Sequence, residues 1–151
     1  MAILRPLLLI LGFSLNSACS TLDVPTFGDE AGAIRGYDPV AYHTDGQPQP
    51  GNPEFSTQYN GADWYFASES NLALFREDPE RYAPQYGGYC AYAMSRGWVV
   101  STDPEAWHIE DGKLYLNYSL GVRKTWLKDV PGYIAKADTH WQEKLEQPVF
   151  E

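Results

Sequence analysis

Two tight turns, each between aromatic-rich segments, restrict the architectures open to this chain. The first turn, Asn60-Gly61-Ala62, joins residues 54–59 to residues 63–67. Asn and Gly tolerate the positive φ angles that a short hairpin connection requires. These residues therefore predict an antiparallel hairpin.

The second turn predicts another hairpin further along the chain. Asp111-Gly112 stands between residues 107–110 and residues 113–118, which are again rich in aromatic and aliphatic side chains. The short run 98–101 is a candidate for a third strand of this part. Hairpins of this kind build antiparallel sheets and disfavour a doubly wound parallel sheet.

Helical patterns follow both hairpins. Ser68 is a candidate N-cap before a helix that carries Leu72 and Phe75, and Asp78-Pro79 is expected to end it. After Ser119, Val122, Trp126 and Val130 fall at helical spacing. We expect Pro131-Gly132 to break that run before a last amphipathic helix over residues 133–145.

These elements together predict an α+β fold, a small antiparallel sheet of hairpins with segregated helices. The chain of 151 residues fits one domain, which we place at residues 34–146 and in which we find no internal repeat. Twenty acidic and eleven basic residues give a net charge of -9, which repels nucleic-acid backbones. We therefore expect no nucleic-acid partner.

The first twenty residues have the composition of a signal peptide. Arg5 is their one charged side chain, and an apolar run over residues 7–15 is too short to span a bilayer. Residues 15–19 resemble the bacterial lipobox, so cleavage before Cys19 and lipidation of Cys19 are expected; ordinary cleavage after Ser20 is the alternative. The protein is thus expected to be a periplasmic or outer-membrane lipoprotein held to the membrane at Cys19, or else a secreted protein.

Residues 21–33 contain Pro25, Gly28 and Gly32 and show little apolar periodicity, which is typical of a flexible tether. Cys90 is the one cysteine beyond the leader, so no disulfide can form within the domain. It stands among aromatic and small residues without a nearby base, which favours a buried structural thiol over a catalytic nucleophile.

Several motifs in order resemble the YHS domain over residues 35–82. They are Gly36-Tyr37-Asp38-Pro39-Val40-Ala41-Tyr42, Tyr59-Asn60-Gly61, Tyr65-Phe66-Ala67-Ser68, Phe75 and Asp78-Pro79-Glu80-Arg81-Tyr82. The segments after residue 82 resemble the longer, secreted proteins of this family, whose function is mostly unassigned.

The resemblance also implies where metal-binding members carry their thiolates. Those three positions hold Ala41, Ala67 and Asn71 in this chain, so the family's metal chemistry does not carry over. A different soft set, His43, Cys90 and Met94, remains as a candidate copper(I) site, with Cys90 and Met94 four residues apart. The alternative to a metal site is that His43 lies at a turn and Met94 packs in the core.

Tyr86, Tyr89, Tyr92 and Trp98 crowd one short segment. They predict either a packed lid over the core or an aromatic contact surface for a ligand or partner.

We therefore expect an extracytoplasmic YHS-like protein that works as a non-enzymatic binding or accessory module for an unidentified protein or small ligand. No cofactor is required, although copper is possible. A soft-metal binding protein that uses Cys90 is the second hypothesis, and a thiol-dependent enzyme is the third.

Overall fold

The computed structural model describes residues 26–146, so the expected signal peptide, Cys19 and the first residues of the expected tether lie outside the described residues. The described elements are, in chain order, β1 (Gly28–Asp29), β2 (Gly32–Ala33), η1 (Ile34–Gly36), α1 (Ala41–Thr44), β3 (Asn52–Tyr59), β4 (Ala62–Phe66), α2 (Glu69–Glu77), α3 (Pro79–Tyr82), η2 (Gln85–Gly88), α4 (Ala91–Met94), β5 (Asp103–Glu110), β6 (Lys113–Asn117), α5 (Leu120–Trp126) and α6 (Val130–Glu146). Within this part of the chain, none of the helices has the length and apolar character needed to cross a bilayer.

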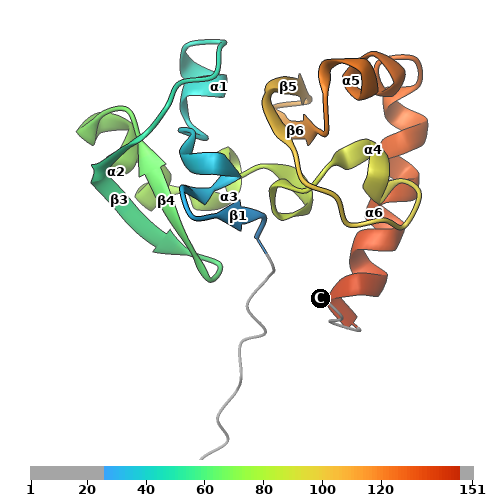
Figure 1. The fold of residues 1–151 in the computed structure, drawn as a ribbon, viewed down its shortest axis with the longest axis horizontal. Helices are drawn as coiled ribbons and strands as arrows, with labels where there is room; N and C mark the ends of the chain where they lie inside the picture. Colours follow the sequence, from blue (N-terminus) through green and yellow to red (C-terminus); the bar gives the residue numbers. More distant parts are fainter. Residues whose placement is uncertain (1–25, 147–151) are drawn as a thin grey trace, which may run out of the picture.

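The α+β prediction is confirmed. The described residues form three two-stranded antiparallel hairpins, β1–β2, β3–β4 and β5–β6, together with six α-helices. Figure 1 shows β3, β4 and α2 on one side of the molecule and α4, α5 and α6 on the other, with β5 and β6 between them. The predicted turns at Asn60 and Asp111 both adopt positive φ, of 47° and 49°.

The expected flexible tether over residues 21–33 needs correction from residue 26 onward. Gly28 and Asp29 pair with Ala33 and Gly32 in the β1–β2 hairpin. Phe27 also donates its backbone N–H to the carbonyl of Gly87 at 2.8 Å. Glycines gave this segment the composition of a linker, but its backbone hydrogen bonds attach it to the domain.

A first core gathers behind the β3–β4 hairpin. Trp64, Phe66 and Phe75 are at most 1% exposed, and the rings of Phe66 and Phe75 lie 5.1 Å apart. Helix α2 delivers Phe75 because it begins where predicted, with the Ser68 hydroxyl accepting from the N–H of Asn71 at 3.1 Å. The apolar side of α2 therefore packs against the β3–β4 hairpin.

The second half of the fold, residues 86–126, repeats the arrangement of the first half, residues 34–75. This repeat corrects our expectation of no internal repeat. Strand β3 pairs with β4 with a register irregularity between Asn52 and Ser56. Strand β5 pairs with β6 with the same irregularity between Asp103 and Trp107, 51 positions later in the chain. Helix α5 then begins like α2, since Ser119, 51 positions after Ser68, also caps its helix.

The connection that precedes each half is also repeated. Residues 34–36 and residues 86–88 each place three successive residues in the left-handed region, with φ of 44°, 60° and 76° and of 56°, 61° and 86°. Gly88 is required in the second turn, because a Cβ there would lie 2.6 Å from the Cγ2 of Ile34. The two left-handed turns therefore pack against each other.

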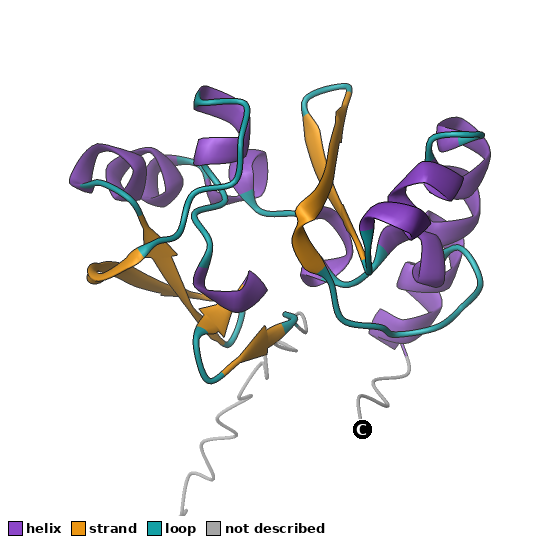
Figure 2. Cartoon of the chain, turned by 45° about the horizontal axis from the view of Figure 1, so that its top comes forward, coloured by secondary structure: helices purple, strands orange, loops and turns teal. Residues whose placement is uncertain are grey.

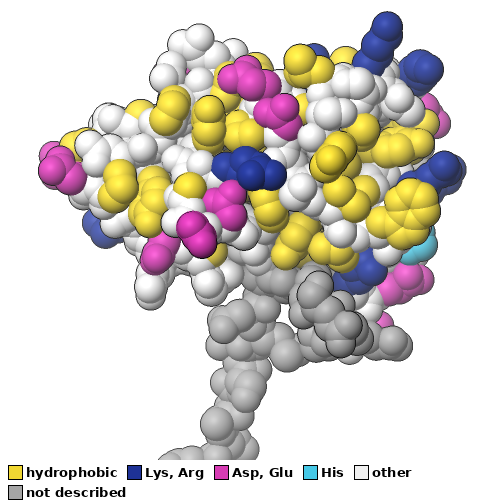
Figure 3. Space-filling view, viewed as in Figure 1, with side chains coloured by type: hydrophobic (Ala, Val, Ile, Leu, Met, Phe, Trp, Pro, Cys, Tyr) yellow, Lys and Arg dark blue, Asp and Glu magenta, His cyan; other side chains and the backbone are white. Residues whose placement is uncertain are grey.

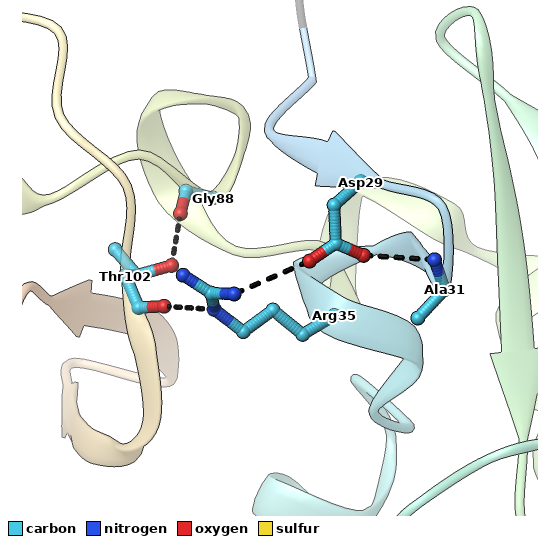
Figure 4. A network of polar contacts seen from close by, with 5 residues as sticks. All are labelled: Asp29, Ala31, Arg35, Gly88 and Thr102. Carbon is cyan, nitrogen blue, oxygen red and sulfur yellow. Dashed lines mark hydrogen bonds and ion pairs between the residues drawn. The ribbon is translucent and has the colours of Figure 1, made fainter.

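A polar network joins the two turns (Figure 4). The guanidinium of Arg35 donates through Nε to the carbonyl of Thr102 at 2.9 Å and pairs through Nη1 with Asp29 at 3.3 Å. The Thr102 hydroxyl donates in turn to the carbonyl of Gly88 at 2.9 Å. The side chain of Arg35, in the first half, therefore donates a hydrogen bond to the backbone of the second half.

The β5–β6 hairpin belongs to both halves, as its central place in Figure 2 indicates. Leu114 and Leu116 face the first core, whereas Tyr115, between them, faces the second core with Trp126. Alternate side chains of a strand point to opposite faces, so one strand supplies both cores. The two cores are therefore linked through β6.

Two predicted boundaries are wrong. Residues 98–101 form no strand, because Trp98 is 60% exposed and its N–H closes the end of α4 on the carbonyl of Ala93. Pro131-Gly132 does not break a helix but lies in the first turn of α6. Proline is tolerated there, since its missing N–H has no intrahelical partner to lose.

Candidate functional site

A buried carboxylate contacts all three positions where the resemblance puts metal-binding thiolates. Asp38 is fully buried, and its Oδ1 accepts from the N–H groups of Val40 and Ala41 at 2.8 and 3.3 Å. Its Oδ2 accepts from the N–H of Ala67 at 2.8 Å and from Nδ2 of Asn71 at 2.7 Å. The three positions predicted to have lost their cysteines therefore converge on one side chain.

The hydrogen-bonding capacity of the Asp38 carboxylate is filled. An ionised carboxylate offers about four lone-pair positions, and four N–H donors surround Asp38. Asn71 directs its NH₂ group, which carries no lone pair for a metal, at the carboxylate. The geometry suits a structural anchor that ties α1 to the end of β4 and the start of α2.

Cys90 is the counterpart of Asp38 in the second half. The N–H of Asp38 donates to the carbonyl of Gln49 at 2.8 Å, and the N–H of Cys90 donates to the carbonyl of Val100 at 2.9 Å. The sulfur of Cys90 then accepts from the N–H of Tyr118 at 3.3 Å, at the place where Asp38 accepts from Ala67. A thiol thus fills the anchor position of the repeat.

The side chain of Cys90 is closed off from solvent. Its side chain is 1% exposed, and its S–H points to Oδ1 of Asn117 at 3.8 Å. Asn117 also accepts from the N–H of Tyr92 at 3.1 Å, while its own Nδ2 has no hydrogen-bond partner among the described residues. Burial raises the pKa of the Cys90 thiol, although bonds from the N–H groups of Ala93 and Tyr118 oppose the shift.

At pH 7.5 we expect Cys90 to react with a disulfide reagent at least about a hundredfold more slowly in the folded protein than in the urea-unfolded chain. In the folded protein the sulfur is buried, and its raised pKa keeps the thiol protonated. The rate of colour release from the reagent, measured in a Cys19→Ser background, tests this. Equal rates in the two states would show instead that Cys90 is an accessible thiolate.

The candidate copper ligands are only partly brought together. Cys90 and Met94 lie at the start and end of α4, and Met94 is fully buried in the second core. His43 instead contacts Tyr82 edge to face, with ring centroids 5.5 Å apart, and belongs to the first half. Within the described part of the chain, no cluster of three or more His, Cys, Asp or Glu side chains is arranged to hold a metal ion.

His43 is half-buried, and its Nε2 has no hydrogen-bond partner among the described residues. Burial, and to a smaller extent the charge of Arg81, lower its pKa, while a hydrogen bond with the backbone of Tyr82 opposes the shift. The neutral imidazole is therefore favoured near pH 7. Metal binding by His43, Cys90 and Met94 stays a prediction.

The four aromatic residues predicted as a lid or contact surface have separate surroundings. Tyr92 packs edge to face on Tyr133 of α6, with ring centroids 5.1 Å apart. Trp98 is exposed at the surface beside the guanidinium of Arg96. Hydrophobic side chains are prominent on this side of the molecule, over α4 to α6 (Figure 3).

The other two members lie near the junction between the halves. Tyr89 packs against Phe27, with ring centroids 5.7 Å apart. Tyr86 donates its hydroxyl to Oδ1 of Asp138 on α6 at 2.8 Å, and burial and this hydrogen bond raise its pKa. Of the four, Tyr86 is the one that lines a pocket at this junction.

This junction pocket has a volume of about 380 Å³. We define it by four aromatic residues and one acid that line it: Tyr59, Trp64, Glu80, Tyr86 and Trp141. They come from the β3–β4 hairpin, α3, η2 and α6, so the pocket lies where the first half meets the last helix. Of these five residues the sequence predicts only Tyr86 as a candidate contact residue, because the other four stand in separate segments that only folding brings together.

The walls of the junction pocket are held by defined contacts. Trp64 donates its indole N–H to the carbonyl of Tyr59 at 2.9 Å. Tyr86 and Trp141 meet edge to face, with ring centroids 6.2 Å apart. These contacts hold the rings in the walls of the pocket, where Trp64 and Tyr86 are almost fully buried.

One family model matches part of the chain. Residues 40–86 match the sequence model of the YHS domain. The match covers the first half of the fold and includes Tyr59, Trp64, Glu80 and Tyr86, whereas Trp141 lies outside it. No curated protein and no solved structure matches the chain.

Proposed function

We propose that this YHS domain protein is a binding module whose small ligand occupies the junction pocket. The observation that carries the proposal is the pocket itself, an opening between residues that match the YHS model and Trp141 of α6. Its volume of about 380 Å³ falls within the usual range of ligand sites. Binding, not catalysis, is the function that this geometry supports best.

The chemistry of the remaining residues favours binding over the two alternatives. The buried, protonated state of Cys90 disfavours a thiol-dependent enzyme, which needs an accessible thiolate. The separation of His43 from Cys90 and Met94 gives a soft-metal site little support. The expected location outside the cytoplasm depends on residues outside the described part and stays a prediction.

The proposal is tested by adding pools of small metabolites (sugars, amino acids, organic acids and amines) to the ¹⁵N-labelled protein. We expect at least one pool to shift the indole N–H resonances of Trp64 and Trp141 while that of Trp98, which does not line the pocket, stays in place. The matched variant is Ala83→Phe, which places a large ring in the pocket wall and should abolish the shifts.

The variant must keep the dispersed amide spectrum of the folded protein for this comparison to count. If no pool moves either indole resonance, or if the shifts persist in Ala83→Phe, the junction pocket is not the binding site.

A further inference from the structure

Large hydrophobic side chains are exposed around α5 and not at the equivalent positions earlier in the fold. Among the described residues, the exposed side chains of this kind all lie within residues 98–127. Tyr118, Leu120 and Leu127 are 55%, 60% and 43% exposed. The equivalent positions, 51 residues earlier, hold three other side chains: Ala67, Glu69 and Arg76. The repeat therefore shows that this arrangement of strand and helix forms without apolar side chains at these positions.

The exposed residues form one surface with two lysines. We define the α5 face as Tyr118, Leu120, Lys124, Leu127 and Lys128. Leu120, Lys124 and Leu127 share one side of the helix, because positions four and seven apart lie above one another and the backbone of Leu127 is still helical, with φ of -66° and ψ of -11°. Neither leucine belongs to the second core, which α5 reaches through the fully buried Trp126.

The charge of this segment is opposite to that of the chain as a whole. Residues 112–128 contain four basic residues and no acidic residue, in a chain of net charge -9. Lys124 and Lys128 are exposed and have no ion-pair partner among the described residues. Figure 3 shows Lys and Arg side chains at the upper right of the molecule, over α5, with hydrophobic side chains near them. Such a face is complementary to a partner that is both anionic and apolar.

We propose that the α5 face docks on the surface of an anionic phospholipid membrane. A bilayer offers phosphate groups to the lysines and, just below them, hydrocarbon to the leucines. Tyr118 suits the boundary between the two, since its ring is apolar and its hydroxyl is polar. The acidic residues elsewhere in the chain oppose this contact little at physiological salt, where charges more than about 8 Å apart are largely screened.

A second copy of this chain fits the α5 face less well. A symmetric contact between two α5 faces would bring lysines against lysines, which repel each other. A contact with residues 26–97 would satisfy the lysines, because acidic residues outnumber basic ones there. It would, however, place the leucines on a surface where no large hydrophobic side chain is exposed. A bilayer satisfies both kinds of side chain at once.

The test is sedimentation of the protein with sucrose-loaded vesicles. It uses the Cys19→Ser background, so that no lipid attached to Cys19 contributes to binding. We expect vesicles of phosphatidylcholine with about 30% phosphatidylglycerol to bind the protein at least about tenfold more tightly than vesicles of phosphatidylcholine alone, because only the former attract the lysines.

Two substitutions by glutamine separate the apolar and the charged contributions. Leu120→Gln removes an apolar contact without a change of charge, and Lys124→Gln removes one positive charge. Each should weaken binding to the anionic vesicles about fivefold. Both side chains are exposed, so both variants should keep the circular dichroism spectrum of the folded protein. Lys144→Gln, an equal charge change on α6, should leave binding within about twofold of the native value.

The proposal is overturned if the anionic vesicles do not bind, if both kinds of vesicle bind equally, or if binding ignores Leu120→Gln and Lys124→Gln. Binding of poly-L-glutamate in place of vesicles would assign the α5 face to an acidic protein segment instead. None of these results bears on the proposed ligand site, because no residue of the α5 face lines the junction pocket.

Discussion

Replacing Asp38 with Ala should lower the free energy of unfolding by about 3–5 kcal/mol, because four N–H donors then lose their acceptor in a buried site. Those donors belong to α1, the end of β4 and α2, so the substitution loosens three elements at once. Urea unfolding followed by circular dichroism measures the loss. Asp38→Asn should also be costly, since its NH₂ group would face other donors.

Asp45→Ala is the matched control for this substitution. Asp45 follows α1 and is exposed, so its removal should change the free energy of unfolding by no more than about 0.5 kcal/mol. A cost below about 1 kcal/mol for Asp38→Ala would mean that water replaces the carboxylate and that the anchor assignment is wrong.

The second large effect is expected at two equivalent core positions. Phe75→Ala and Trp126→Ala each remove a nearly fully buried ring, and the two residues lie 51 positions apart at the same place in the repeat. Each should cost about 3–5 kcal/mol through lost burial and the cavity that remains. Both variants should have a lower Tm than the native chain when thermal unfolding is measured.

The two variants should also unfold in one transition each. Leu114 and Leu116 of β6 belong to the first core and Tyr115 to the second, so damage to either core weakens the strand that both share. Scanning calorimetry measures this, with exposed Trp98→Ala as a control that leaves Tm nearly unchanged. Two separate transitions in Trp126→Ala would show that the halves fold independently.

The local pattern of the sequence predicts the hairpins and the helix starts well, because each depends on a few adjacent residues. Asn60-Gly61 and Asp111-Gly112 permit positive φ, and Ser68 and Ser119 supply hydroxyls to a free helix N–H. Such signals work without knowledge of the rest of the fold.

The internal repeat could not be predicted from the sequence, because its two copies share backbone geometry and hydrogen bonds but few residue types. Asp38 and Cys90 share almost no chemistry as residue types, yet both accept N–H bonds from the start of the next helix and from the end of a strand. Phe75 and Trp126 differ in size while filling equivalent places. A comparison of residue types alone therefore misses a relation that hydrogen bonds make plain.

The candidate site shows the same limit. The resemblance predicted Ala41, Ala67 and Asn71 as a group from the order and spacing of their motifs, but it did not reveal that all three donate hydrogen bonds to Asp38. Tyr86 was predicted from local aromatic density, whereas Trp141 reaches the pocket from α6, more than fifty residues later. Only tertiary packing brings the two together.

Our central proposal is that the protein binds a small ligand where the residues that match the YHS model meet α6, and not at Ala41, Ala67 and Asn71. The most direct measurement is a full amide ¹H–¹⁵N shift map recorded with the metabolite pool that moves the indole resonances. We predict the largest shifts at Asn60, Gln85 and Gly87, which line the junction pocket, and none at Ala41, Ala67 and Asn71. Shifts centred on those last three residues would contradict the account.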